Sequence, residues 1–220
     1  MASTLSFHAP SCFLIHSSFW ARLCCIDIER WLQRTSALYG TQGRPVYFLD
    51  NHDMSRFLAW TGEHGQERLL AALGFMASLS SPMVIYYGTE TGISGGRAAA
   101  GFNDSNRIAM PWNSLDTKLI GRVSEILVAR TRLPAITRGG RLPVFCDDQV
   151  LVMRKHHPSG DVLVAVNFGD AERTVQLPAS ATGAGVGAWK PVLGASAPRV
   201  AADGSMTWIL PALSTSWAQP

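Results

Sequence analysis

The chain has 220 residues and a mass of 23.8 kDa, enough for one large domain or two small ones. Its composition, 47% hydrophobic and 16% charged, excludes a disordered chain, and a net charge of +3 without any basic cluster argues against a nucleic-acid partner. No apolar run reaches the roughly 18 residues of a membrane span, so no membrane is expected as a partner either.

Residues 1–44 show no steady period, apart from a short helix expected near Ile26–Leu38. We interpret them as an N-terminal segment of unclear origin. The segment lacks a basic start and does not resemble a secretory signal, which leaves the location open and slightly favours the cytoplasm. The chain has four cysteines: Cys12, Cys24, Cys25 and Cys146. Their spacing fits neither a disulfide framework nor a zinc site, so no metal is expected.

Residues 45–136 alternate between strand-like and helix-like patterns. The apolar run RPVYFLD predicts a buried strand, GQERLLAALGFMASLS a helix over 65–80, PMVIYYGTE a second buried strand, and LIGRVSEILVARTRL a helix over 119–133. Strands joined through helices in this order predict a parallel sheet. Such sheets carry their chemistry at the carboxyl ends of the strands, where both strands here are followed by polar residues.

A dense polar cluster follows the first strand: Asp50, Asn51, His52, Asp53 and Arg56. Asp50 is expected to cap turn amides, whereas Asn51 suits either a turn or a ligand. His52 and Asp53 suit either a structural ion pair or a polar binding site, and no third ligand at a suitable spacing indicates a metal. Tyr86 and Tyr87 end the second strand, where one of them can offer an aromatic face or simply fill the core.

Residues 137–220 differ in character, with more Gly, Ala and Pro and with short alternating strands separated by turns. Four strands are expected from their patterns: QVLVMRKH, DVLVAVNF, ERTVQLP and SMTWILP. This part is predicted to be a small antiparallel β-sandwich.

Four motifs, taken together, resemble the α-amylase family of glycoside hydrolases. FLDNHDMSRF is similar to the end of the seventh barrel strand, PMVIYYGTETG to the eighth strand and its loop, NRIAMPW to the stretch after that loop, and LIGRVSEILVARTRLPAITRGG to the last barrel helix. The nearest kin in this resemblance are the neopullulanase, cyclomaltodextrinase and maltogenic-amylase types. The resemblance implies the C-terminal part of a (β/α)8 barrel, from strand seven to helix eight, followed by a β-sandwich.

The resemblance also implies roles for individual residues. Asp53 corresponds to the carboxylate that stabilises the oxocarbenium-like transition state of a retaining enzyme. His52, Asn51, Arg56 and Tyr87 are then expected to bind an α-glucan or maltooligosaccharide substrate. The family motifs imply no cofactor, and Arg107, Met110 and Trp112 are expected to anchor the loop beneath the barrel mouth.

Two other carboxylates of the family are missing from this sequence. The nucleophile motif G-x-R-x-D and the general-acid motif are absent, and about 45 residues before the seventh strand are too few for six strand–helix units. We therefore expect the C-terminal fragment of an enzyme acting on α-glucosidic bonds of starch-type oligosaccharides. A non-catalytic carbohydrate-binding remnant and a half-barrel that needs a partner chain are the alternatives. Both barrel strands are expected to lack an outer neighbour, which would favour self-association.

Overall fold

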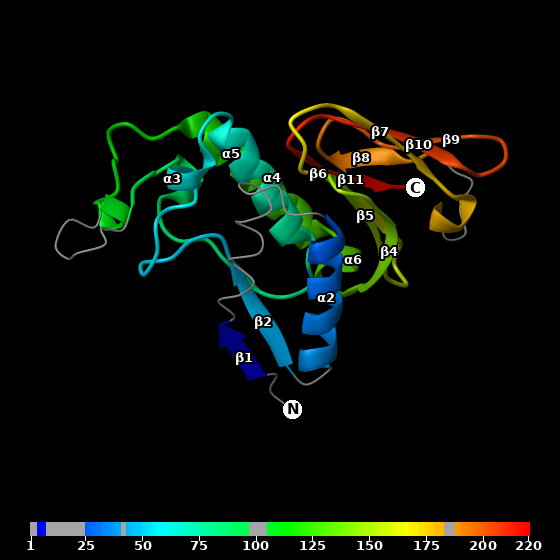
Figure 1. Ribbon diagram of the computed structural model, residues 1–220, viewed down its shortest axis with the longest axis horizontal. Coiled ribbons are helices and arrows are strands. Elements are labelled where there is room, and N and C mark those ends of the chain that lie inside the picture. The colour runs from blue at the N-terminus through cyan, green and yellow to red at the C-terminus, as the bar shows by residue number, and fades with distance from the viewer. Residues whose placement is uncertain (1–3, 8–24, 41–42, 97–104, 183–187) are drawn as a thin grey trace.

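The computed structural model describes residues 4–7, 25–40, 43–96, 105–182 and 188–220 of the chain. A three-stranded parallel sheet with its helices forms one part, and a β-sandwich forms the other (Figure 1). This is the expected partial barrel followed by a β-sandwich. Within these residues no helix combines the length and the apolar character that crossing a membrane requires.

The partial barrel holds the first elements in chain order. Its strands are β1 (Thr4–Phe7), β2 (Gly43–Phe48) and β3 (Met83–Val84). Its helices are α2 (Cys25–Tyr39), α3 (Leu58–Thr61), α4 (Gly65–Ser78), α5 (Thr117–Arg132) and α6 (Pro134–Arg138), with short 3-10 turns at Thr89–Thr91 and Ser105–Arg107. The helices expected near Ile26–Leu38, over 65–80 and over 119–133 are confirmed.

Strand β2 lies in the middle of the parallel sheet. Its first half pairs with β1, in register from Gly43 to Val46, and its second half pairs with β3. The expectation that the first barrel strand has an open outer edge is therefore wrong for that half, because β1 covers it. Burial of four consecutive residues, Val46–Leu49, confirms that this strand is covered on both faces.

Strand β3 differs from its expected environment. Val84 is 43% exposed and Tyr87 is 38% exposed, so the second barrel strand is not buried on both faces. The reason is its place at the edge of the sheet, with only β2 paired to it among the described residues.

Helices α4 and α5 pack against each other beside the sheet. Ten of the fourteen residues of α4 are buried, since it lies between the barrel sheet and the sandwich. Helix α5 buries Leu119, Val123 and Ile126 along one stripe, and Asp116 caps its start by accepting hydrogen bonds from the Lys118 and Leu119 amides.

The sandwich consists of two antiparallel sheets. The five-stranded sheet has the order β4-β5-β6-β11-β8 and the three-stranded sheet the order β7-β10-β9. The strands are β4 (Gly140–Cys146), β5 (Val150–His156), β6 (Val162–Asn167), β7 (Arg173–Leu177), β8 (Lys190–Leu193), β9 (Arg199–Val200), β10 (Met206–Leu210) and β11 (Ser214–Gln219). The four strands expected from sequence correspond to β5, β6, β7 and β10 and are confirmed.

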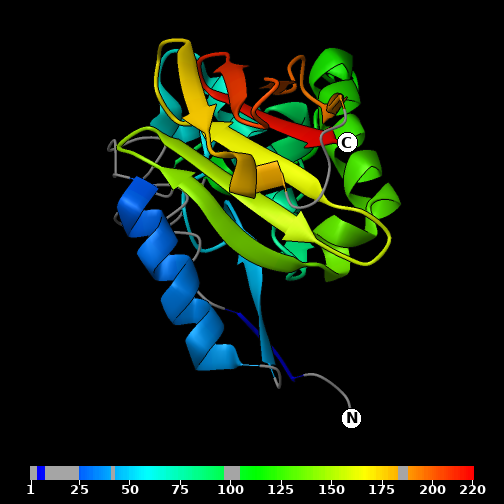
Figure 2. The same ribbon diagram turned by 90° about the vertical axis from the view of Figure 1, so that its right-hand side faces the viewer.

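The five-stranded sheet belongs to two cores at once. One face packs on the three-stranded sheet around Trp208, and the other packs on the barrel helices around Trp217 and Phe75. Figure 2 shows the sandwich facing the viewer, with α2 and α5 on either side of it. A single apolar core therefore joins the sandwich to the partial barrel.

Candidate functional site

The candidate site begins where β2 ends, and Asp50 is its structural anchor. This carboxylate is 2% exposed and accepts hydrogen bonds from the Phe57 amide at 2.9 Å and the Thr89 hydroxyl at 2.8 Å. Burial raises the pKa of Asp50 above its ordinary value, against the opposing effect of these two bonds and of Arg56. The expectation that Asp50 satisfies turn amides is confirmed.

Arg56 lies fully buried beneath the loops that carry the cluster. Its guanidinium donates to the carbonyl oxygens of Asn106 at 2.8 Å and Tyr87 at 2.7 Å, and it stacks under the ring of Tyr86, with 3.9 Å between the guanidinium carbon and the ring centroid. A side chain in this buried position cannot contact a sugar. The expected substrate-binding role of Arg56 is therefore corrected to one of positioning, because the side chain is fully buried and its Nε and Nη1 groups donate to main-chain oxygens.

Residues after the second loop return to hold the first one. Asn106, itself buried, donates from its side-chain amide to the carbonyl oxygens of His52 and Met54, and Arg107 donates to the same His52 carbonyl at 2.8 Å. The loops after β2 and β3 are thus one bonded unit. This unit lies on the side of the molecule away from the sandwich (Figure 1).

Asp53 and His52 are the exposed members of the cluster. Their side chains are 62% and 64% exposed, and His52 Nε2 lies 3.2 Å from Asp53 Oδ2. The guanidinium of Arg107 lies 3.5 Å from the other carboxylate oxygen of Asp53. The Asn51 side chain accepts the Asp53 amide at 2.8 Å, which fixes the turn that lets both neighbours face solvent.

Tyr87 forms one wall beside this cluster. Its hydroxyl donates to the Ile108 carbonyl at 2.7 Å, and its ring meets that of Tyr86 edge to face with centroids 4.7 Å apart. Both rings lie over the buried Arg56 guanidinium. Tyr87 is therefore oriented by the hydrogen bond of its hydroxyl and by the cation–π contact of its ring with Arg56.

The structure brings most of the expected site residues together. His52, Asp53 and Asn51 share one turn, and Tyr87 lies on the adjoining loop, whereas Arg56 lies underneath. Sequence reasoning missed the contact of Arg107 with Asp53, since it assigned Arg107 only to loop anchoring. Trp112 was also expected beneath the barrel mouth, but it is 75% exposed.

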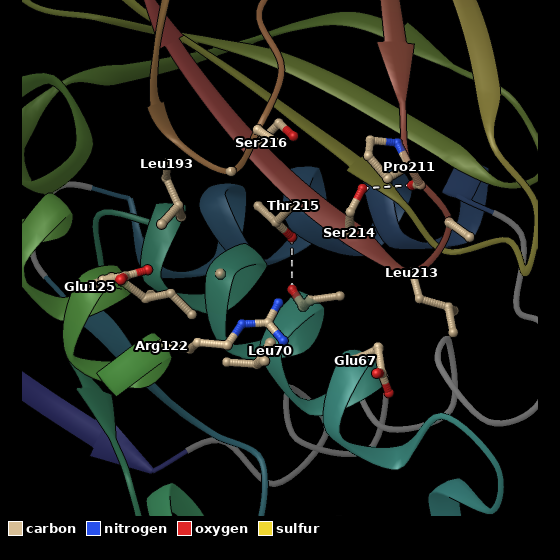
Figure 3. Close-up of a pocket in the computed structure, with 16 residues that line it drawn as sticks. Glu67, Leu70, Arg122, Glu125, Leu193, Pro211, Leu213, Ser214, Thr215 and Ser216 are labelled. Atoms are coloured by element: carbon tan, nitrogen blue, oxygen red, sulfur yellow. Dashed lines mark hydrogen bonds between the residues drawn. The ribbon is translucent and has the colours of Figure 1, made fainter. Parts of the chain in front are cut away.

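Two other observations bear on what the site can hold. Among the described residues no group of three or more His, Cys, Asp or Glu side chains is arranged to hold a metal ion. A cavity of about 260 Å³ lies between α4, α5 and β11, and Figure 3 shows its lining, with the Thr215 hydroxyl donating to the Ala71 carbonyl. None of the candidate site residues lines this cavity, so it is a separate feature.

Comparison with known proteins gives the family. Residues 11–121, half of the chain, match the sequence family described as the α-amylase catalytic domain, and residues 137–217 match a domain of unknown function, DUF3459. The chain belongs to the α-amylase family. The catalytic-domain match begins before residue 45, where the sequence motifs first resemble the family.

Relatives of this α-amylase-family chain include a cyclomaltodextrin glucanotransferase from Niallia circulans, 31% identical over 156 residues. That match covers 71% of this chain and 20% of the relative. α-Amylase 2 of Dictyoglomus thermophilum is 30% identical over 158 residues, which cover 69% of this chain and 26% of the relative.

A solved structure of AmyP in complex with maltotriose superimposes with a TM-score of 0.83 at 21% identity, over 100% of this chain and 51% of that one. At this identity the likeness shows the α-amylase fold. The chain thus spans a fifth to a quarter of the two relatives and about half of the solved structure. The narrower resemblance to neopullulanase-type enzymes, and the domain boundaries after residues 44 and 136, stay predictions.

Proposed function

We propose that this chain supplies the transition-state-stabilising side of an α-amylase-family catalytic site that cleaves α-glucosidic bonds of starch-type oligosaccharides with retention. The observation that carries the proposal is the exposed Asp53 carboxylate at the carboxyl end of β2, fixed by Asn51 and flanked by His52 and Arg107. The family match supports the chemistry. The maltotriose bound to a protein of the same fold supports the substrate class.

The role of Asp53 follows from the charge that the reaction develops. Cleavage passes through an oxocarbenium-like transition state, and a fixed carboxylate beside the sugar ring stabilises it more than the neutral ground state. Arg107 and His52 hold this carboxylate between them, so it needs little reorganisation when positive charge forms. His52 and Asn51 are the proposed partners of sugar hydroxyls.

The neighbouring aromatic and cationic residues prepare the site. Tyr87 offers a ring held at two points, suited to stacking on the apolar face of a glucosyl unit. Arg56 acts through the loops, because its bonds to the carbonyl oxygens of Tyr87 and Asn106 fix both walls of the site. It is a positioning residue.

Hydrolysis by this chain by itself is not expected. A retaining glycosidase needs a nucleophile and a general acid about 5 Å apart, and the sequence has neither family motif. A half-barrel that works with a second segment carrying those groups fits this composition, as does a sugar-binding remnant. Both depend on the same Asp53 cluster, and they differ in whether turnover appears once the missing carboxylates are supplied.

The test joins this chain to the amino-terminal part of an α-amylase-family enzyme that carries the nucleophile and the general acid. In this fusion we expect Asp53→Asn to lower kcat on maltooligosaccharides by about a thousandfold or more, with KM changed less than about tenfold. The reason is that the carboxylate contributes to the transition state more than to substrate binding.

The matched control is Asp203→Asn, which changes an Asp in an exposed turn of the sandwich. It should leave kcat and KM of the fusion unchanged. A fusion that turns over normally with Asp53→Asn would show that Asp53 has no catalytic role. A fusion that folds and binds maltotriose without turnover, even with Asp53 present, would favour the sugar-binding remnant.

A further inference from the structure

A second pocket lies at the other end of β2 from the Asp53 cluster. It has a volume of about 310 Å³ and lies where α2, the start of β2, and the sandwich strands β4 and β5 meet. We call it the basic pocket, because four cationic side chains line it and no carboxylate does among the described lining residues: Arg44, Arg138, Arg141 and Lys155.

Lys155 is the unusual member of this group. It is 1% exposed, yet within the part of the chain that the structure describes its ammonium group donates a single hydrogen bond, to the Ser80 hydroxyl at 2.5 Å. The Ser80 hydroxyl is itself bonded to the Gly139 carbonyl at 3.0 Å and so is a neutral partner. No carboxylate pairs with Lys155 in the described part of the chain. A buried ammonium without a counter-charge is costly for the fold.

The neighbouring arginines increase this excess of positive charge. Arg141 is paired with Glu29 at 2.6 Å, so that carboxylate is already engaged. Arg130 donates to the carbonyl oxygens of Leu79 and Ser81 and has no acidic partner among the described residues. Together they add to burial in lowering the pKa of Lys155 to about 8, which leaves the amine largely charged near neutral pH.

Two further cations reach the same pocket from its rim. Arg44 at the start of β2 and Arg138 at the end of α6 are exposed and line the pocket, and neither has an ion-pair partner within the described ranges. Hydroxyl groups of Ser81, Tyr47 and Tyr39 also line it. The pocket is thus lined by guanidinium groups, one ammonium group and hydroxyl groups. These are hydrogen-bond donors of the kind that bind an oxyanion.

We propose that the basic pocket binds a small oxyanion of the phosphate class, held at its base by Lys155 and at its rim by Arg138 and Arg44. A doubly charged oxyanion would supply the negative charge that Lys155 lacks among the described residues around it. Its several acceptor oxygens can take donors from the ammonium and both guanidinium groups at once. The site lies at the amino-terminal end of β2 and is separate from the sugar site.

Isothermal titration of the 220-residue chain with inorganic phosphate, at constant ionic strength, tests the proposal. We expect saturable binding at one site per chain, and a loss of affinity of at least tenfold in Lys155→Met. Phosphate should also raise the Tm of the unsubstituted chain, since a ligand that binds only the folded state stabilises it. Arg138→Gln, at an exposed position, should weaken binding too, and it keeps the test decisive if Lys155→Met does not fold.

The controls separate a site from general screening. Arg199→Gln removes an exposed arginine from the sandwich outside this pocket and should bind phosphate as the unsubstituted chain does. If Arg138→Gln and Lys155→Met both bind phosphate as tightly as the unsubstituted chain, or if chloride at the same ionic strength has the same effect as phosphate, the proposal is overturned. Glucose 1-phosphate distinguishes the source: tighter binding than inorganic phosphate assigns the site to a sugar phosphate, and equal or weaker binding assigns it to the free ion.

Discussion

Two aspartates in one loop, Asp50 and Asp53, have opposite environments. Asp50 is buried, and its two carboxylate oxygens accept hydrogen bonds from the Phe57 amide and the Thr89 hydroxyl. Asp53 is mostly exposed, and His52 and Arg107 flank it. Asp50 bonds the loop after β2 to Thr89 in the loop after β3. The turn that contains Asp53 is therefore held in place by contacts that do not involve the Asp53 carboxylate.

Lys155 gives a prediction at the same scale, through the pH dependence of stability. Burial, with Arg141 and Arg130 nearby, lowers the pKa of Lys155 in the folded chain from 10.5 to about 8. Between these values the unfolded chain binds more protons, so the free energy of unfolding should rise with pH. Over this window we expect a gain on the order of 3 kcal/mol. Burial raises the pKa of Tyr47 from 10.0 to about 12, so this residue lowers the free energy of unfolding only above about pH 10, at the top of the window.

Lys155→Met is the variant that isolates this effect. Its free energy of unfolding should lack the rise, so in urea denaturation without phosphate the difference between the two chains should change by on the order of 3 kcal/mol between pH 8 and pH 10.5. Loss of the bond to Ser80 adds only a constant offset. Parallel pH profiles for the two chains would mean that Lys155 is not the group that titrates.

The residues of the candidate site were predictable from sequence where they are neighbours along the chain. His52 and Asp53 stand together in the motif and meet in space because the strand ends and the turn exposes both. Arg107 lies more than fifty positions away, and its contact with Asp53 depends on how the second loop returns. Nothing in the local pattern around Arg56 distinguishes a ligand from a buried anchor, so its burial came only from the structure.

At the scale of elements, the contact between α4 and β11 joins the two parts of the chain. Gly74 faces Thr215 so closely that a Cβ added to Gly74 would lie 2.9 Å from the Thr215 Cβ. The Thr215 hydroxyl also donates to the Ala71 carbonyl at 2.8 Å, in the wall of the cavity drawn in Figure 3. The absence of a side chain at Gly74 is what lets strand and helix approach to hydrogen-bonding distance.

Gly74→Ala and Gly121→Ala form a matched pair that tests this contact. Both add a methyl group to a helix, which by itself favours the helix by about 1 kcal/mol. At Gly121, with open space around its Cβ position, we expect a gain of roughly 0.5–1 kcal/mol in unfolding free energy. At Gly74 overpacking should outweigh the gain and cost about 1–3 kcal/mol. Chemical denaturation measures both, and equal stabilisation of the two variants would contradict the close approach.

The long periodic elements were predictable, and the strand that organises the sandwich was not. Helices α4 and α5 follow the helical period over many residues, and β5 and β6 each begin with a run of apolar residues. Strand β11, with the sequence STSWAQ, contains too many polar residues to indicate a buried strand. It is buried because it lies between β6 and β8 and under α4, a position that depends on distant parts of the chain.

At the scale of the whole molecule, one apolar core extends from the sandwich into the partial barrel. The barrel sheet stays open, with three strands among the described residues. The sandwich and helices α4, α5 and α6 cover one side of the barrel sheet, and β1 covers one edge of β2. The far edge of β3 has no partner strand among the described residues. Within the described residues the main-chain groups on that edge have no strand partner, and they lie next to the exposed side chain of Val84, which favours pairing with another chain.

We therefore expect the 220-residue chain to self-associate, and Val84→Lys to reduce this association by placing a charge on the open edge. Size-exclusion chromatography with light scattering over a concentration series measures the effect. Ile209→Lys is the control, because Ile209 is 44% exposed, close to the 43% of Val84, but lies on the central strand β10 of its sheet. If association runs through the β3 edge, only Val84→Lys shifts the chain toward monomer. Equal shifts would assign the association to general surface hydrophobicity, and a monomeric unsubstituted chain would show that the edge is already covered.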